Sequence, residues 1–130
     1  MRLYTACRRI SEVTPGYQYG GGHDRPISQV RGSQRLDCSS SVSRALYMAG
    51  FFPFSWSLIS GGFAKWGKAG RGEDFTVWYN HRHVWIQFHG QYGGYRRFDT
   101  TPWGPGRLGP RIRQTPRPTT NFSPRHVPGH

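Results

Sequence analysis

The sequence predicts an α+β domain in which a helix packs on a small antiparallel sheet. Three observations support this fold class. Residues 37–51 carry the clearest helical pattern of the chain, residues 75–80 and 83–88 alternate as strands do, and the strand-like segments all follow the helical ones. The chain has 130 residues, which suffices for one such domain and leaves no room for a second large core.

Residues 1–14 are predicted as a short helix. Leu3, Cys7 and Ile10 fall at helical spacing, and a Pro-Gly pair ends the pattern. The next stretch, residues 16–35, is polar and rich in glycine, so we expect a loop there.

Residues 37–51 are predicted as the main helix. Val42 and Leu46 mark its apolar face, and either Asp37 or Ser39 is suited to cap its start. A glycine near the end of the segment suits the C-terminus of a helix.

The second half of the chain is predicted to form the sheet. Residues 51–74 are aromatic and punctuated by glycine, which indicates a long loop with a helical turn near residues 62–66. Aromatic and β-branched residues alternate in three predicted antiparallel strands: 75–80, 83–88 and 95–100. His81 and Arg82 are predicted to close a tight hairpin between the first two strands.

The domain is predicted to span residues 1–103. Residues 104–130 are rich in proline, glycine and arginine, and we expect a tail that wraps the domain or leads to a linker.

The chain is strongly basic, with 18 lysines and arginines against six acidic residues and a net charge of +12. This balance indicates polyanionic surroundings, such as nucleic acid, an anionic membrane face or an anionic cell-wall polymer. No stretch has the length and apolarity of a membrane span, and residues 1–13 lack the apolar core of a signal peptide.

Cys38 stands at the start of the predicted main helix. The dipole and the unpaired N–H groups of a helix N-terminus favour a thiolate and can stabilise an oxyanion. The alternative is that Cys38 is a small buried residue, which is common for a free cysteine. A disulfide with Cys7, the second cysteine, would exclude a nucleophilic role.

His83 opens a predicted strand and is the candidate base for Cys38, because cysteine hydrolases bring cysteine and histidine together in space. A third group usually orients such a histidine. Asp99, on the next predicted strand, is the first candidate for this group, and His89 competes with it. The structural alternatives are a solvent-facing histidine and a salt bridge from Asp99 to a neighbouring arginine.

Three segments together resemble the NlpC-type cell-wall cysteine peptidases. They are Tyr-Gln-Tyr-Gly-Gly-Gly from residue 17, Leu-Asp-Cys-Ser-Ser-Ser-Val from residue 36, and His-Val-Trp-Ile-Gln-Phe from residue 83. The resemblance covers about residues 17–101. It implies a papain-like α+β fold and hydrolysis of amide bonds in peptidoglycan stem peptides, with the D-glutamyl–diaminopimelate bond favoured. That chemistry needs no metal and no cofactor.

The resemblance also implies a role for individual residues. Cys38 would be the nucleophile, His83 the base and Asp99 the third member of the catalytic set. Residues near the nucleophile would hold the substrate or the oxyanion: Tyr17, Asp37 and Ser39. Three tryptophans are also candidates to line the groove, although large aromatic side chains more often belong to the core: Trp56, Trp66 and Trp85.

The chain departs from the family pattern at four positions. Tyr19 replaces the usual tryptophan, and Ser40 stands where glycine is commoner. Trp85 replaces a small residue after His-Val, which predicts a narrower cleft. Asp99 stands where the family has a histidine, asparagine or glutamine.

The ending Phe-Ser-Pro-Arg-His-Val-Pro-Gly-His and the overall pattern are similar to peptidase modules of actinobacteria and their phages. This similarity implies a phage lysin or a tail-associated module. Such a protein would be made in the host cytoplasm without a signal peptide, and would act on the cell wall after phage-mediated release or as part of a virion. We expect a monomer whose partner is peptidoglycan, with no obligatory nucleic acid and no membrane span.

Two other functions fit parts of the sequence. Arginines alternate with aromatic residues in the third strand and the tail, which fits a nucleic-acid-binding module without catalysis. His81 and His83, with His23, Asp24 or His89, are metal ligands by residue type, although no third ligand stands at a recognisable spacing.

Overall fold

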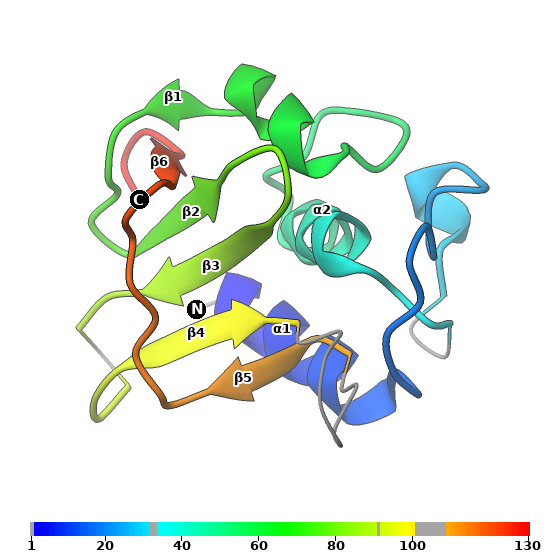
Figure 1. Ribbon diagram of the computed structural model, residues 1–130, viewed down its shortest axis with the longest axis horizontal. Helices are drawn as coiled ribbons and strands as arrows, with labels where there is room; N and C mark the ends of the chain where they lie inside the picture. Colours follow the sequence, from blue (N-terminus) through cyan, green and yellow to red (C-terminus); the bar gives the residue numbers. More distant parts are fainter. Residues whose placement is uncertain (1, 32–33, 91, 101–108) are drawn as a thin grey trace.

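Within the described part of the chain, two α-helices and a six-stranded antiparallel sheet form the domain, which confirms the predicted α+β class (Figure 1). The computed structural model describes residues 2–31, 34–90, 92–100 and 109–130. Its elements, in chain order, are α1 (Arg2–Val13), the 3-10 turn η1 (Ile27–Gln29), α2 (Cys38–Met48), the 3-10 turn η2 (Ser60–Lys65), β1 (Lys68–Ala69), β2 (Phe75–Tyr79), β3 (Val84–Phe88), β4 (Arg96–Asp99), β5 (Arg111–Arg113) and β6 (Ser123–His126).

The two predicted helices, the helical turn after them and the three predicted strands are all present, with ends that differ by one to three residues. The connection between β2 and β3 is longer than the predicted two residues. The Asn80 side chain accepts hydrogen bonds from the amides of Arg82 and His83, at 2.8 and 2.9 Å, and so closes a four-residue turn. His83 therefore lies in this turn, one residue before β3 begins.

The sheet draws two strands from the segment that the sequence predicted as a tail. The strand order is β1-β6-β2-β3-β4-β5, so β6 lies between β1 and β2, and β5 forms one edge. Figure 1 shows the C-terminal segment, in orange and red, returning across the sheet to reach this place. Residues 109–130 are thus part of the domain, and the boundary predicted at residue 103 does not separate a tail from the sheet.

Pro124 explains why β6 is hard to recognise in the sequence, since proline cannot donate a hydrogen bond and is rare inside sheets. The Pro124 carbonyl accepts from the Gly70 amide at 3.0 Å, so the ring nitrogen also faces the β1 side. The pairing of β6 with β2, in which Trp78 stands opposite Pro124, does not need the missing N–H group.

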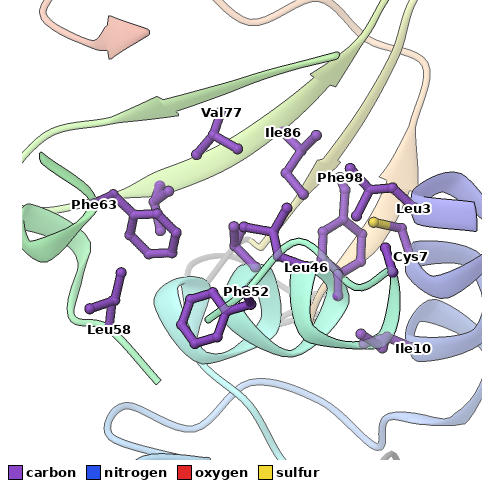
Figure 2. Close-up of a cluster of buried hydrophobic side chains, with 14 of the residues drawn as sticks. Leu3, Cys7, Ile10, Leu46, Phe52, Leu58, Phe63, Val77, Ile86 and Phe98 are labelled. Atoms are coloured by element: carbon purple, nitrogen blue, oxygen red, sulfur yellow. The ribbon is translucent and has the colours of Figure 1, made fainter. Parts of the chain in front are cut away.

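One hydrophobic core joins the helices to the sheet (Figure 2). Leu3, Cys7 and Ile10 of α1 meet Leu46 of α2 and Phe98 of β4, and all five are at most 1% exposed. The same strands turn their alternate residues to the other face of the sheet. That alternation places Arg97 and Asp99 opposite the core, at the end of the sheet where the candidate site lies.

Candidate active site

The start of α2 is held by its own side chains, which fixes the position of Cys38. Asp37 is the N-cap: its carboxylate accepts from the Ser40 amide at 2.8 Å, and the Ser40 hydroxyl accepts from the Asp37 amide at 3.0 Å. This reciprocal pair is a capping box. The amides of Cys38 and Ser39 belong to the first turn, where no helical acceptor precedes them. Their free N–H groups place the partial positive charge of the helix dipole next to the Cys38 side chain.

The glycine-rich loop packs directly on this cap. Tyr17 and Leu36 form a parallel β-bridge, and the Gly20 amide donates to the Asp37 carboxylate at 3.1 Å. Gly22 has a φ of +81°, and a Cβ atom there would lie 2.7 Å from the Ser40 side chain. A side chain at this position would collide with the helix cap, so the close approach of the loop requires glycine.

His83 and Asp99 form a short buried pair. The His83 Nε2 atom lies 2.5 Å from Asp99 Oδ1, with side-chain exposures of 14% and zero. The Thr100 amide donates to the same carboxylate oxygen at 2.9 Å. Because an ionised carboxylate only accepts, Nε2 carries the proton, and Nδ1 is left to face other groups.

The side chain of Cys38 also lies near His83. Burial lowers the pKa of His83, but its interactions with Asp99, to which it is hydrogen-bonded, and with Cys38 raise it to about 9. The structure thus brings together the three sequence-predicted residues Cys38, His83 and Asp99. Both cysteines are free, so the disulfide that would have excluded this arrangement is absent from the structure, which describes both residues.

Asp99 is also the centre of an arginine cluster. Its second oxygen, Oδ2, accepts from Nη1 of Arg97 and from Nη1 of Arg117, the latter at 2.8 Å. Burial raises the pKa of Asp99, but the hydrogen bond from His83 and the charges of His83, Arg117 and Arg97 lower it overall. The salt bridge considered as an alternative therefore coexists with the histidine contact. No sequence pattern predicted a role for Arg117, because residue 117 lies in the predicted tail.

A cleft of about 620 Å³ opens above Cys38. Its walls come from the glycine-rich loop, the start of α2, the residues before and in η2, and the β2–β3 turn: Tyr17, Tyr19, Gly20, His23, Asp37, Cys38, Ser39, Ile59, Ser60, His81 and Arg82. The predicted binding residues Tyr17, Asp37 and Ser39 all line it. The side-chain atoms Ser60 Oγ and Cys38 Sγ lie 3.4 Å apart, a contact that the sequence analysis missed.

The tryptophans are placed differently from the prediction. Trp66 and Trp85 are at most 1% exposed and belong to the packed interior, so they do not line the groove, and Trp85 does not narrow the cleft. Trp56 is half exposed and lies outside the cleft walls. Large apolar side chains stabilise the fold most when they are fully buried, which accounts for the first two positions.

His23 is a second histidine at the nucleophile. Its Nε2 atom lies 3.0 Å from both Asp37 Oδ1 and Ser39 Oγ. Burial raises the pKa of Asp37, but the hydrogen bonds from His23 and from the Ser40 amide lower it overall. The same ring nitrogen contacts both Asp37 and Ser39, so His23 stabilises the cap of α2.

Tyr17 keeps its proton in the cleft. Burial and the nearby charges of Cys38 and Asp37 raise its pKa to about 12. A phenol in this state can donate a hydrogen bond to a developing oxyanion or to a substrate carbonyl.

His89, the competing third residue, is not part of the constellation. Its Nε2 atom lies 2.8 Å from the Thr76 hydroxyl, at the far end of β3. Among the described residues, no three histidine, cysteine, aspartate or glutamate side chains are grouped closely enough to hold a metal ion. The metal ligand set suggested by His81 and His83 is therefore not assembled within those residues.

The free energy of unfolding should fall as the pH rises from about 6.5 to about 9. The pKa of His83 is higher in the folded chain than its ordinary value of about 6.5 in the unfolded chain. The stabilisation is therefore complete below pH 6.5 and is lost as the pH rises through about 9, an effect on the order of 3 kcal/mol. Urea denaturation near both pH limits measures it.

The histidine variants provide the comparison for this measurement. His83→Gln should lose the dependence over this pH range. His89→Gln should retain it, because burial and the charge of Arg71 lower the pKa of His89. An equal slope for wild type and His83→Gln would contradict the prediction.

Comparison with known proteins identifies no relative of this chain, so the geometry of the site is the basis for inferring its function. A scan against protein-family models found no match, and searches of curated proteins and of solved structures found none either. Within the described ranges, no helix combines the length and the apolarity needed to cross a membrane. The chemistry of the cleft therefore carries the functional reasoning.

Proposed function

We propose that this protein is a cysteine hydrolase that cleaves amide bonds in peptidoglycan stem peptides. One observation carries the proposal: Cys38, at the capped start of α2, lies near His83, and the buried carboxylate of Asp99 forms a hydrogen bond with that histidine. Nucleophile, base and orienting group in this order are the parts that covalent acyl transfer requires.

The reaction runs through an acyl-enzyme. His83 takes the thiol proton, and the Cys38 sulfur attacks the substrate carbonyl carbon to form a C–S bond. The carbonyl oxygen becomes an oxyanion, which the amides at the start of α2 and the hydroxyl of Tyr17 stabilise. The C–N bond then breaks as His83 returns its proton to the leaving amine. Water then attacks the thioester carbonyl carbon with His83 as base, the C–S bond breaks, His83 returns the proton to the Cys38 sulfur, and the carboxylic acid leaves.

The element order supports a papain-like fold of the NlpC type. A helix that begins at the nucleophile is followed by a strand that begins next to the histidine, and the next strand along the chain carries the third residue. The first two sequence segments that resemble that family line the cleft, and the third begins at His83, directly after the cleft-lining Arg82. We assign the finer fold class on this correspondence.

The chemistry of the cleft supports an anionic substrate. Arg82 lines the cleft, while the carboxylate of Asp37 is already engaged by His23 and by backbone amides. A stem peptide that contains glutamate and diaminopimelate carries carboxylates next to its amide bonds. Together with the net charge of +12, this arrangement favours approach to an anionic wall polymer. A lysin or tail-associated enzyme of an actinobacterial phage would meet this substrate.

Digestion of purified peptidoglycan tests the proposal. The full chain should release new amino groups, and mass spectrometry of the fragments should identify the amide bond that is cut. Cys38→Ala should release none above background. Cys7→Ala is the matched control, because Cys7 is a buried thiol of α1 in the core and is not among the residues that line the cleft. This variant should retain activity.

Two results would contradict the proposal: no new amines with wild type, or equal release by Cys38→Ala. The nucleic-acid alternative makes a separate forecast. It predicts steeply salt-dependent affinity for DNA or RNA that Cys38→Ala does not change, in the absence of hydrolysis.

A further inference from the structure

Arg117 reaches the His83–Asp99 pair from the segment that joins β5 to β6. Its Nη1 atom lies 2.8 Å from Asp99 Oδ2 and 3.3 Å from His83 Nε2. No family motif marks this residue, and the sequence analysis placed it outside the domain. The structure places it against the two groups on which the proposed proton transfers depend.

The position of Arg117 is fixed on several sides. Its backbone amide donates to the Tyr95 hydroxyl at 3.0 Å. The centre of its guanidinium lies 5.4 Å from the ring centre of Phe122 and 6.0 Å from that of Trp85. A guanidinium held between aromatic rings and a carboxylate is restrained in orientation, whereas a surface arginine is usually not.

We propose that Arg117 is a positioning residue of the catalytic pair, which fixes the Asp99 carboxylate so that His83 is held in its productive tautomer and orientation. This inference rests on the proposed function, because it assigns Arg117 a part in the same reaction. Arg117 touches neither the substrate nor the nucleophile in the described contacts, so it acts through Asp99.

The hydrogen-bond geometry gives the first reason. The carboxylate has two oxygens, and the two arginines Arg97 and Arg117 both donate to Oδ2. Oδ1 is thereby turned to His83 and accepts the Nε2 proton. Without Arg117, Oδ2 loses one of its two arginine donors, and the carboxylate is held less firmly.

Charge gives the second reason. Among the described residues, the titratable and charged groups that act on the His83 ring are Cys38 from α2, Asp99 from β4 and Arg117 from the segment between β5 and β6. The cation of Arg117 disfavours protonation of His83, which Asp99 and Cys38 favour. If the pKa of His83 were too high, the imidazolium would not transfer its proton to the leaving amine. By lowering that pKa, Arg117 allows His83 to act as the general acid.

Kinetics and NMR titration of the full chain with Arg117→Gln test this role. We expect kcat for stem-peptide hydrolysis to fall about tenfold, with KM nearly unchanged, because one charge-assisted hydrogen bond is lost. The pKa of His83, assigned in the NMR spectrum with His83→Gln, should rise. Arg117→Lys restores the cation and should recover most of the rate.

Arg71→Gln is the matched control. Arg71 also lies over a tryptophan ring, at 5.6 Å from that of Trp78, and it makes no described contact with His83 or Asp99. It should leave both kcat and the His83 titration unchanged. An unchanged His83 titration in Arg117→Gln, or equal loss of rate in Arg117→Lys and Arg117→Gln, would overturn the inference. The titration does not need a substrate, so it decides the role of Arg117 even if wild type fails to cut peptidoglycan.

Discussion

Asp99→Asn should lower turnover of the proposed substrate by about ten-thousandfold, the loss typical of an orienting aspartate replaced by its amide. The asparagine retains the shape of the side chain, but its NH₂ group can donate to His83 Nε2. The ring is then favoured in the tautomer that carries its proton on Nδ1, where it cannot accept the thiol proton of Cys38. Steady-state hydrolysis of a stem peptide measures the effect.

The same substitution should also destabilise the fold. Asp99 is 2% exposed, and Arg97, at 9%, would lose its buried counter-ion. Removal of one partner from a buried ion pair costs about 3–5 kcal/mol. Turnover is therefore compared at a low temperature at which the native near-ultraviolet spectrum of the variant is intact.

Asp74→Asn separates the catalytic effect from a general one. Asp74 is also paired with a histidine, His130, at 3.2 Å, but both side chains are more than 40% exposed. This variant should retain wild-type turnover and nearly wild-type stability, since exposed pairs contribute about 0–1 kcal/mol. Equal turnover for Asp99→Asn and wild type would contradict the orienting role of Asp99 and leave it only a structural ion pair with Arg97 and Arg117.

A chain that ends at residue 103 should not fold cooperatively. It lacks β5 and β6, and β6 is an inner strand that pairs with both β1 and β2. It also lacks Phe122, which packs edge-on against the buried Trp85 at 5.8 Å. A fully buried large apolar side chain contributes about 1.5–3 kcal/mol, so exposure of several removes most of a typical total of about 5–15 kcal/mol.

A chain that ends at residue 126 is the control for this truncation. It retains β5, β6 and Arg117, and loses only the last four residues, which include the exposed pair of His130 with Asp74. Thermal melting followed by circular dichroism should show a cooperative transition for this chain and none for residues 1–103. A cooperative melt of the shorter chain would restore the predicted boundary.

The elements that the sequence predicted correctly share a strong periodic pattern. The helix from Cys38 and the strands β2 and β3 bury one face against the core, so apolar residues repeat at the helical or strand spacing. β5 and β6 do not show such a pattern. β5 is only three residues long with arginine at both ends, and β6 contains Pro124. Neither segment is recognisable as a strand from its sequence alone, because its pairing with the adjacent strands of the sheet defines it.

The candidate site divides in the same way. Cys38, His83 and Asp99 lie on elements with a clear pattern, and a family resemblance adds their order. His23, Ser60 and Arg117 lie in loops or turns, and only the folded chain brings them into contact with site residues: Ser39, Cys38 and His83, respectively. Long-range contacts of this kind leave no local spacing to be recognised.

The place of β6 has a consequence for the order of folding. β1 and β2 are neighbours in the chain, yet β6, which joins them into one sheet, is the last of the described strands to be synthesised. Until residues 123–126 insert, the edge of β2 remains open, and Arg117 has not yet been brought to the cleft. Such late closure makes folding slow and leaves an unpaired strand edge for a time. It also means that the proton-transfer machinery is complete only after β6 has been synthesised.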